Sequence, residues 1–314
     1  MKRSRVLLRK ALRWCGLALS VLALVWIGRR FVRGGGIETL SHMAISRGFA
    51  AALMAGVAVY VLALCLLAFA WWRMLARFSP LRLPGLPTMA TYAVSQYGKY
   101  LPGNVAHYAL RHAWGRRHGI PHESLALAAL LEALLLLVVA FALSLAVNLH
   151  RVSILSRVDP SLVLLSLVAG IVALTLILRW ARGSHHATRW HIPALAPATL
   201  AISAVCYAGF FLLGTLSLAG LALGLGDAVP SFVDLLAANA ASWFAGFVVV
   251  GAPAGLGVRE ATFVALAGGT LGESQALLLI GLFRLVTFVG DTLFFAAGSA
   301  CVRIDARRSG QRAG

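Results

Sequence analysis

Long apolar stretches separated by short polar segments are the main pattern along this chain of 314 residues. A bilayer has a hydrocarbon core about 30 Å thick, which a helix of roughly 20 apolar residues can cross. Six stretches predict such helices, at residues 14–28, 48–72, 124–150, 161–178, 199–223 and 274–302. The first is short, and it spans only if the arginines at its ends extend their charged groups to the membrane surface.

Two further apolar regions are interrupted and predict a different structure. Residues 83–110 contain a Leu-Pro-Gly break at 101–103, and residues 231–269 contain a break rich in Gly and Pro at 251–257. Backbone that leaves a helix cannot face lipid, and it is tolerated at membrane depth only inside protein or beside a water-filled cavity. We therefore expect two broken, re-entrant helical hairpins. The alternative is eight ordinary spans, two of them containing proline.

The order of these elements predicts the fold. The segment 14–150 reads span, span, broken hairpin, span, and the segment 160–302 repeats this order from the other side of the membrane. An inverted-topology repeat has this pattern, with substrate sites near the bilayer midplane where interrupted helices meet. The predicted fold is all-α and polytopic: a single integral membrane domain with basic tails at 1–13 and 303–314.

Composition and charge also indicate a membrane protein. Hydrophobic residues make up 60% of the chain and charged residues 12%, and the mean hydropathy is +0.86, which excludes a soluble, disordered or fibrous protein. The net charge is +18, and twenty of the 28 Lys and Arg residues fall in segments that the six-span topology places in the cytoplasm. This bias predicts that both termini are cytoplasmic, and no nucleic-acid partner is expected. The basic N-terminus followed by an apolar stretch without a convincing cleavage site predicts a retained signal anchor.

Three ionisable residues lie within the predicted spans, where an unpaired charge costs a few kcal/mol or more. Glu132 lies in the third span, and Arg284 lies at the matching place in the sixth. These two residues could pair with each other, or Arg284 could pair with Asp291, which lies two helical turns further along the same face. Such charges indicate either a headgroup or proton-coupling site, or a structural ion pair.

The two predicted breaks carry the other candidate site residues. Backbone N–H groups freed at a helix start favour anions such as phosphate, and an arginine can bind phosphate as a two-pronged fork. The candidate headgroup-binding residues are Lys99, Tyr100, Asn104, Arg259 and Arg284, and the candidate break residues are Pro102, Gly103, Pro253, Gly255, Gly257 and Glu260. The alternatives are that the first break anchors the chain at the interface and that the second is a capped helix with a local ion pair.

Several classes of site are not expected from this sequence. The four cysteines lie in or beside apolar stretches without CxxC spacing, and the nine histidines have no metal-site spacing, so we expect neither a metal nor a cofactor. No nucleotide-binding or hydrolase motif occurs. An enzyme that uses Glu132 as acid or base within the membrane would need a nucleophile or metal ligands that the sequence does not show. We therefore do not expect an enzyme.

These motifs, in this order, resemble the lysylphosphatidylglycerol synthase transmembrane region family, the flippase-like membrane domain of MprF-type proteins. The resemblance covers residues 48–302 and depends on Tyr-Leu-Pro-Gly at 100–103, Glu132 in a span, Pro-x-Gly-Leu-Gly-Val-Arg-Glu at 253–260 and Phe-Arg at 283–284. The motif at 253–260 is the most specific of these. The family usually has Gly where this chain has Ala254, and it often has Arg where this chain has Ala133.

The resemblance implies a lipid translocase of the bacterial cytoplasmic (inner) membrane. Such a protein moves or binds an anionic phospholipid, an aminoacylated lipid or a polyprenyl or other isoprenoid-linked lipid. No aminoacyl-transferase domain precedes Gly314, so lysyl transfer is not expected. The alternative function is a non-transporting partner that presents a lipid substrate to a separate glycosyltransferase or synthase. The expected partners are membrane lipids, such an enzyme, and a second copy of the chain in a homo-oligomer.

Overall fold

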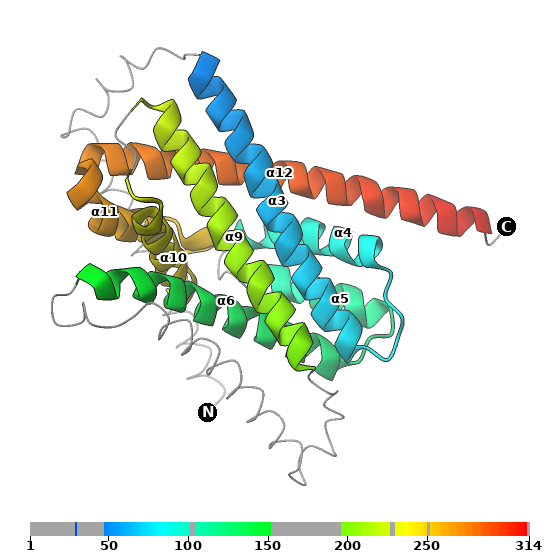
Figure 1. The fold of residues 1–314 in the computed structure, drawn as a ribbon. Helices are drawn as coiled ribbons and strands as arrows, with labels where there is room; N and C mark the ends of the chain where they lie inside the picture. The colour runs from blue at the N-terminus through cyan, green and yellow to red at the C-terminus, as the bar shows by residue number, and fades with distance from the viewer. Residues whose placement is uncertain are drawn as a thin grey trace, which may run out of the picture. The chain divides into compact units, whose positions relative to one another are not determined.

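The structure is a computed structural model, which describes Arg29 and residues 47–100, 105–151, 196–226, 230–249 and 252–312. The predicted spans at 14–28 and 161–178 lie outside the described residues, as do Pro102, Gly103 and Asn104. In chain order the elements are α3 (Arg47–Phe78), α4 (Gly85–Gln96), the 3₁₀ turn η1 (Tyr97–Tyr100), α5 (Ala106–Arg117), α6 (His122–Arg151), α9 (Pro197–Gly224), α10 (Phe232–Val248), the 3₁₀ turn η2 (Pro253–Gly255), α11 (Val258–Leu271) and α12 (Glu273–Arg312) (Figure 1). The described part of the chain is all-helical, as predicted.

Four of the helices are long and apolar enough to cross a membrane. Their apolar lengths are 31 residues in α3, 24 in α6, 28 in α9 and 33 in α12. At 1.5 Å per residue, even the shortest exceeds the roughly 30 Å of a hydrocarbon core. These helices correspond to the second, third, fifth and sixth predicted spans, so the four predictions that fall on described residues are confirmed as long apolar helices.

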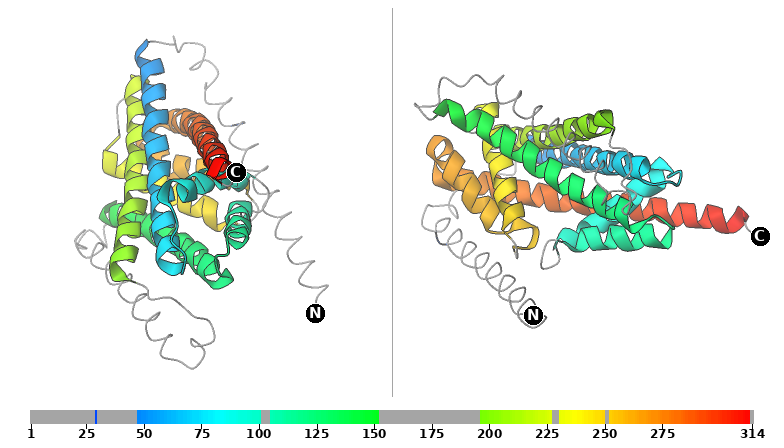
Figure 2. Two further views of the ribbon diagram at one scale, coloured as in Figure 1. Left: turned by 90° about the vertical axis from the view of Figure 1, so that its right-hand side faces the viewer. Right: turned by 90° about the horizontal axis from the view of Figure 1, so that it is seen from below.

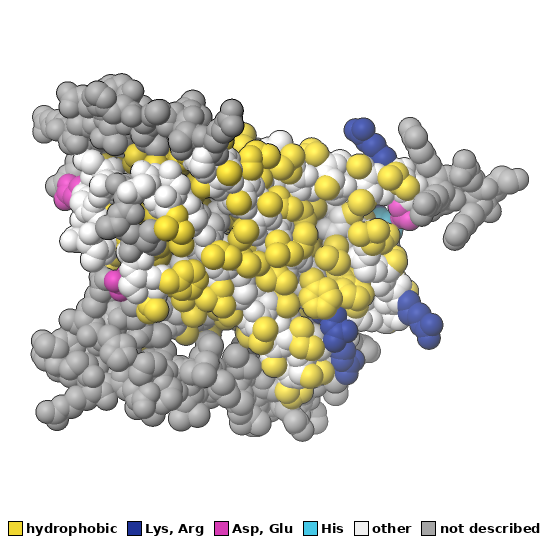
Figure 3. All heavy atoms as spheres, turned by 45° about the horizontal axis from the view of Figure 1, so that its top comes forward, with side chains coloured by type: hydrophobic (Ala, Val, Ile, Leu, Met, Phe, Trp, Pro, Cys, Tyr) yellow, Lys and Arg dark blue, Asp and Glu magenta, His cyan; other side chains and the backbone are white. Residues whose placement is uncertain are grey.

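The surfaces of these long helices are unusual for a protein in water. Large apolar side chains lie more than half exposed on each of them, including Met54, Leu130, Val205 and Leu293. Figure 3 shows hydrophobic side chains spread continuously over one face, with Lys and Arg at its margin. Contiguous apolar surface of this extent marks contact with lipid or with another protein. Together with the helix lengths, it identifies the chain as a membrane protein.

Both interrupted regions form pairs of short helices. In the first, α4 and α5 have 12 residues each and are separated by η1 and the segment that holds the Leu-Pro-Gly break. In the second, α10 has 17 residues and α11 has 14, with η2 between them. None of the four reaches the roughly 20 residues of a full span. The predicted helix–break–helix pattern is present twice, whereas the inverted repeat remains a prediction.

The chain divides into two compact units, each built from three discontinuous segments. Unit 1 contains residues 1–60, 98–106 and 211–290, and unit 2 contains residues 61–97, 107–210 and 291–314. The helices α3, α9 and α12 each give one part to unit 1 and the other part to unit 2. Each unit therefore combines segments from both halves of the predicted repeat.

Small residues let α3 and α9 pack closely as antiparallel neighbours (Figures 1 and 2). In unit 1, a Cβ atom added to Gly224 would lie 2.7 Å from the Cβ atom of Ala52. In the same unit Ser217 donates a hydrogen bond of 3.2 Å to the carbonyl oxygen of Gly56. Close approach at small residues and hydrogen bonds between helices are the main sources of helix association in lipid, where no hydrophobic driving force acts between helices.

Candidate functional site

The break between α10 and α11 has a backbone that only a few residue types adopt easily. Ala254 has φ +51°, Gly255 has φ +70° and Gly257 has φ +82°, all in the left-handed region. Glycine enters this region without a steric penalty, whereas alanine is strained there by about 1–2 kcal/mol. The glycines therefore allow the chain to reverse and to begin α11 directly after Gly257. This places Arg259 and Glu260 in the first turn of that helix.

Glu260 connects the start of α11 with Arg284 through hydrogen bonds from both of its oxygens. One of its oxygens accepts a hydrogen bond of 2.6 Å from the backbone N–H of Gly257, which caps α11. Its other oxygen accepts from Nε of Arg284, and Nη2 of Arg284 donates to the carbonyl oxygen of Ala254 at 3.1 Å. Because Glu260 is buried and holds two donors, its charge is balanced by Arg284. The alternative from the sequence, a capped helix with a local ion pair, holds for the cap, whereas the ion pair is not local and joins Glu260 to Arg284 on α12.

Within the part of the chain that the structure describes, Arg259 differs from Arg284 in having no acidic partner. Among the described residues no carboxylate lies within salt-bridge distance of it, and its buried Nε has no hydrogen-bond partner. Its guanidinium carbon lies 5.6 Å from the centre of the Trp243 ring, a cation–π contact. With Glu260 and Arg284 balanced, the cluster carries one excess positive charge. An excess charge beside a helix start is the condition for binding an anion.

Two glycines make room for the stem of Arg259. A Cβ atom added to Gly246 would lie 2.5 Å from Cγ of Arg259, and one added to Gly255 would lie 2.9 Å from its Nε. Any larger residue would therefore push the arginine out of its place. On the other side, Trp243 is held by stacking on Phe247 at 5.0 Å and by an edge contact with Phe211 at 5.4 Å. The position of the guanidinium is thus fixed by packing before any ligand arrives.

The first break contributes two further candidate residues to the same unit. Lys99 and Tyr100 belong to unit 1, and Nζ of Lys99 lies 5.4 Å from the centre of the Tyr100 ring. The structure therefore places Lys99, Tyr100, Arg259 and Arg284 in one unit. Asn104, the fifth predicted headgroup residue, lies outside the described residues.

Glu132 belongs to a second cluster, in unit 2. Nη1 of Arg111 donates to one oxygen of Glu132 at 2.7 Å, and the hydroxyl of Tyr92 donates to the other at 3.0 Å. The three side chains are buried, with residue exposures of 1–2%. From the sequence, Arg284 could pair with Glu132 or with Asp291. The structure instead pairs Glu132 with Arg111 and pairs Arg284 with Glu260, while Asp291 is buried in the α12 segment of unit 2.

Aromatic rings surround Arg111. Its guanidinium carbon lies 4.3 Å from the ring centre of Tyr92, 4.9 Å from that of Tyr108 and 5.3 Å from that of Trp71. Each such contact stabilises a desolvated cation by about 0.5–2 kcal/mol. Since the charges of Arg111 and Glu132 cancel, this cluster joins α5 to α6 and offers no net charge to an anion. The structure thus separates a neutral cluster in unit 2 from a positive one in unit 1.

Sequence reasoning missed several residues of both clusters. Arg111 lies in a segment that the six-span topology places in the cytoplasm, yet it is 2% exposed. The signal that could have found it is the buried carboxylate of Glu132, which needs a cation nearby. Trp243 and Gly246 looked like ordinary residues of an apolar helix. Their roles depend on contacts with Arg259 that no spacing in the sequence reveals.

Metal binding finds no support in the part of the chain that the structure describes. No group of three or more His, Cys, Asp or Glu side chains there could hold a metal ion. Two histidines, His112 and His122, meet at 2.8 Å between ring nitrogens, which makes a hydrogen-bonded pair. Of the cysteines, Cys206 is buried, and Cys65 and Cys301 are half-buried free thiols.

Comparisons with known proteins do not identify this chain. No family model matches it, and no curated protein matches it. The class that the fold defines is therefore a polytopic α-helical membrane protein, and its function has to be argued from the two clusters.

Proposed function

We propose that the protein is a lipid translocase that binds the phosphate of an anionic or polyprenyl-linked lipid at Arg259 and moves that lipid between leaflets of a bacterial cytoplasmic membrane. The observation that carries the proposal is the excess positive charge of the Arg259, Glu260 and Arg284 cluster at an interrupted helix. In a membrane protein, a buried cation without a counter-ion is costly unless a ligand supplies the negative charge.

The three charged residues have different parts in this proposal. Arg284 and Glu260 hold the break in shape, because they bind each other, the N–H of Gly257 and the carbonyl of Ala254. Arg259 is the ligand-binding group, because a guanidinium has the two-pronged donor geometry that suits a phosphate. The Trp243 ring lies against the guanidinium and Nε is buried, and a site of lower dielectric constant strengthens the attraction between guanidinium and phosphate.

The resemblance to the lysylphosphatidylglycerol synthase transmembrane region family supports the same function. The resemblance indicates that the cargo is a lipid. The structure gives a physical reason for the motif at 253–260: its glycines shape the break, and its Arg and Glu are the two charged residues at the start of α11. The second function considered from the sequence, a partner that presents lipid to an enzyme, would use the same binding step without the movement.

The test is a lipid translocation assay in proteoliposomes. Fluorescently labelled phosphatidylglycerol is placed in both leaflets, and dithionite reports the fraction that reaches the outside. We expect wild-type protein to expose inner-leaflet label and Arg259→Gln to slow this at least about tenfold, the factor for 1.4 kcal/mol of lost interaction. Glutamine keeps the first part of the stem, beside Gly246, and removes the charged guanidinium.

The matched control is Arg77→Gln, which removes an exposed arginine at the end of α3. This variant is expected to match the wild type. If wild-type protein exposed no more label than empty liposomes with phosphatidylglycerol, lysyl-phosphatidylglycerol or undecaprenyl phosphate, translocation would be refuted. Loss of binding to these lipids in Arg259→Gln, without any transport by the wild type, would favour the presenting partner.

A further inference from the structure

A cavity of about 370 Å³ opens in unit 2, well away in sequence from the Arg259 break. Three elements form it: α4, α5 and the last part of α12. Its lining residues are Thr91, Val94, Ser95, Leu110, Trp114, Ser299, Val302 and Arg303. The volume lies within the range of sites that bind small molecules, about 300–1,000 Å³.

The lining of this cavity is amphiphilic. Arg303 gives it a positive charge, and Ser299, one helical turn earlier in α12, adds a hydroxyl beside it. Val94, Leu110 and Val302 give apolar walls, of which Leu110 is 50% exposed and Val302 is 41% exposed. Among the described residues that line the cavity there is no acidic one. A ligand that matches this lining has one anionic group and one apolar chain.

The position of the cavity along α12 indicates where such a ligand comes from. The long apolar stretch of α12 ends at Val302, and the candidate span ends at Asp305. Arg303 therefore lies where the hydrocarbon core gives way to the lipid headgroups. Trp114 on the wall fits this level too, because tryptophan is enriched at membrane interfaces. The cavity begins at headgroup depth and continues toward the acyl chains.

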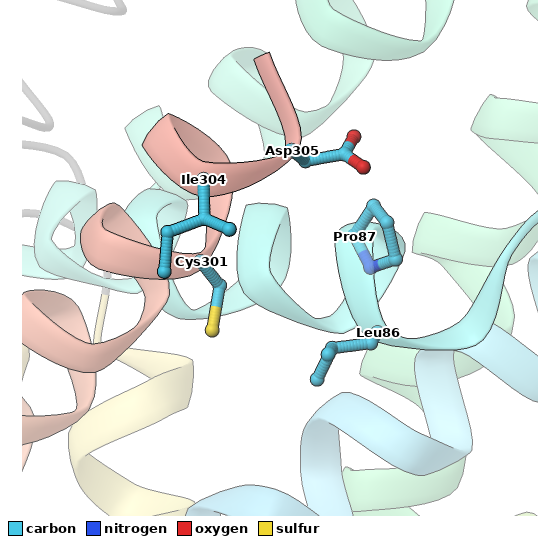
Figure 4. Close-up of a pocket in the computed structure, with 5 residues that line it drawn as sticks. All are labelled: Leu86, Pro87, Cys301, Ile304 and Asp305. Atoms are coloured by element: carbon cyan, nitrogen blue, oxygen red, sulfur yellow. The ribbon is translucent and has the colours of Figure 1, made fainter. Parts of the chain in front are cut away.

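A second cavity lies beside the same part of α12, and its lining does not include Arg303. It has about 250 Å³ and is lined by Leu86, Pro87, Cys301, Ile304 and Asp305 (Figure 4). Of the described residues that line it, the charged one is the acid Asp305, whereas Arg303 is the charged lining residue of the first cavity. Neighbouring residues of α12 thus line two different cavities, Arg303 the first and Asp305 the second.

We infer that the Arg303 cavity is a docking site for one anionic glycerophospholipid, with the phosphate on Arg303 and Ser299 and an acyl chain along Val94, Leu110 and Val302. This site is distinct from the Arg259 cluster. It depends only on the location of the chain in a membrane, so it holds whether or not the protein moves lipid.

The test is native mass spectrometry of the purified protein with phosphatidylglycerol and phosphatidylcholine in equal amounts. All variants carry Arg259→Gln, so that the other proposed site does not contribute. We expect one phosphatidylglycerol to remain bound, and Arg303→Gln to lower the bound fraction about fivefold, the factor for the roughly 1 kcal/mol of one basic residue at an anionic surface. Arg77→Gln, an exposed arginine at the end of α3, is the charge-matched control and is expected to change nothing.

A steric pair of variants tests the cavity itself. Ser299→Phe fills the cavity and is expected to remove the bound lipid with Arg303 intact, whereas Ala300→Phe adds the same bulk at an exposed neighbour outside the lining and is expected to retain it. Melting temperatures report whether each variant is folded, and Arg303→Gln tests the charge without added bulk. Equal retention of the two lipids, or full retention of phosphatidylglycerol in both Arg303→Gln and Ser299→Phe, would overturn the inference.

Discussion

Removing one member of the buried Arg111–Glu132 pair should lower the free energy of unfolding more than replacing both members with apolar residues. Glu132→Leu leaves Arg111 with its charge, at 2% exposure, and no carboxylate partner. Removing one member of a buried pair costs about 3–5 kcal/mol, because the other charge stays uncompensated. Arg111→Met leaves the Glu132 carboxylate with only the hydroxyl of Tyr92 at 3.0 Å, and we expect a loss in the same range.

The double variant Arg111→Met, Glu132→Leu should be clearly more stable than either single variant. Both charges are then absent, and apolar side chains of similar volume fill the space among Trp71, Tyr92 and Tyr108. Exchanges of this kind are often neutral or stabilising. The double variant also loses three cation–π contacts, each about 0.5–2 kcal/mol, and this loss limits how much stability it regains over the single variants.

The assay is equilibrium unfolding in mixed micelles, followed by tryptophan fluorescence, with all four members of the cycle. The expected coupling between the two positions is at least about 3 kcal/mol, the lower bound for an uncompensated buried charge. If the losses of the two single variants simply added in the double variant, the pair would not act as a unit and the reasoning would be refuted. If the double variant also kept lipid movement, the pair would be structural and not part of proton coupling.

Two further predictions concern packing and pH. Gly246→Ala should destabilise the protein by about 1–3 kcal/mol, since the new Cβ atom would lie 2.5 Å from Cγ of Arg259. The control is Gly269→Ala in α11, which has open space around it. It should be neutral or stabilising in the same unfolding experiment. Burial, with smaller effects from His122 and Arg116, lowers the pKa of His112 below 6.5, so the folded state favours the neutral ring. Stability from this ring is fully present above pH 6.5, the unfolded value, and is lost as the pH falls below 6.5 and through the lower pKa of the folded state. The drop in melting temperature between pH 7.5 and pH 5 should therefore shrink in His112→Gln.

The apolar pattern predicted the elements of the fold because lipid imposes a minimum length on every spanning helix. The spans at 48–72, 124–150, 199–223 and 274–302 each fall inside a long helix, and both Pro-Gly breaks fall between short ones. The pattern could not predict how the helices combine. Unit membership depends on contacts between residues far apart in sequence, such as Ser217 with Gly56.

The charged residues illustrate the same limit. The sequence identified Glu132, Arg259, Glu260 and Arg284 as candidates, because charges within apolar regions are conspicuous. Their partners could not be deduced, since matching positions in two halves say nothing about which side chains meet. Arg111 was missed as a partner because its helix, α5, is more polar than a span, so its charge resembled a loop charge.

The central claim is that Arg259 binds the anionic group of a lipid because it is the unbalanced cation of its cluster. The most direct measurement is the dithionite assay with labelled phosphatidylglycerol and labelled phosphatidylcholine, in wild-type protein, Arg259→Gln and Arg259→Lys. The account predicts that wild-type protein moves phosphatidylglycerol faster than phosphatidylcholine and that Arg259→Gln removes this difference. Arg259→Lys has the charge but not the two-pronged guanidinium, so it should retain part of the difference. An Arg259→Gln variant that is folded and still moves the anionic lipid at the wild-type rate would contradict the account.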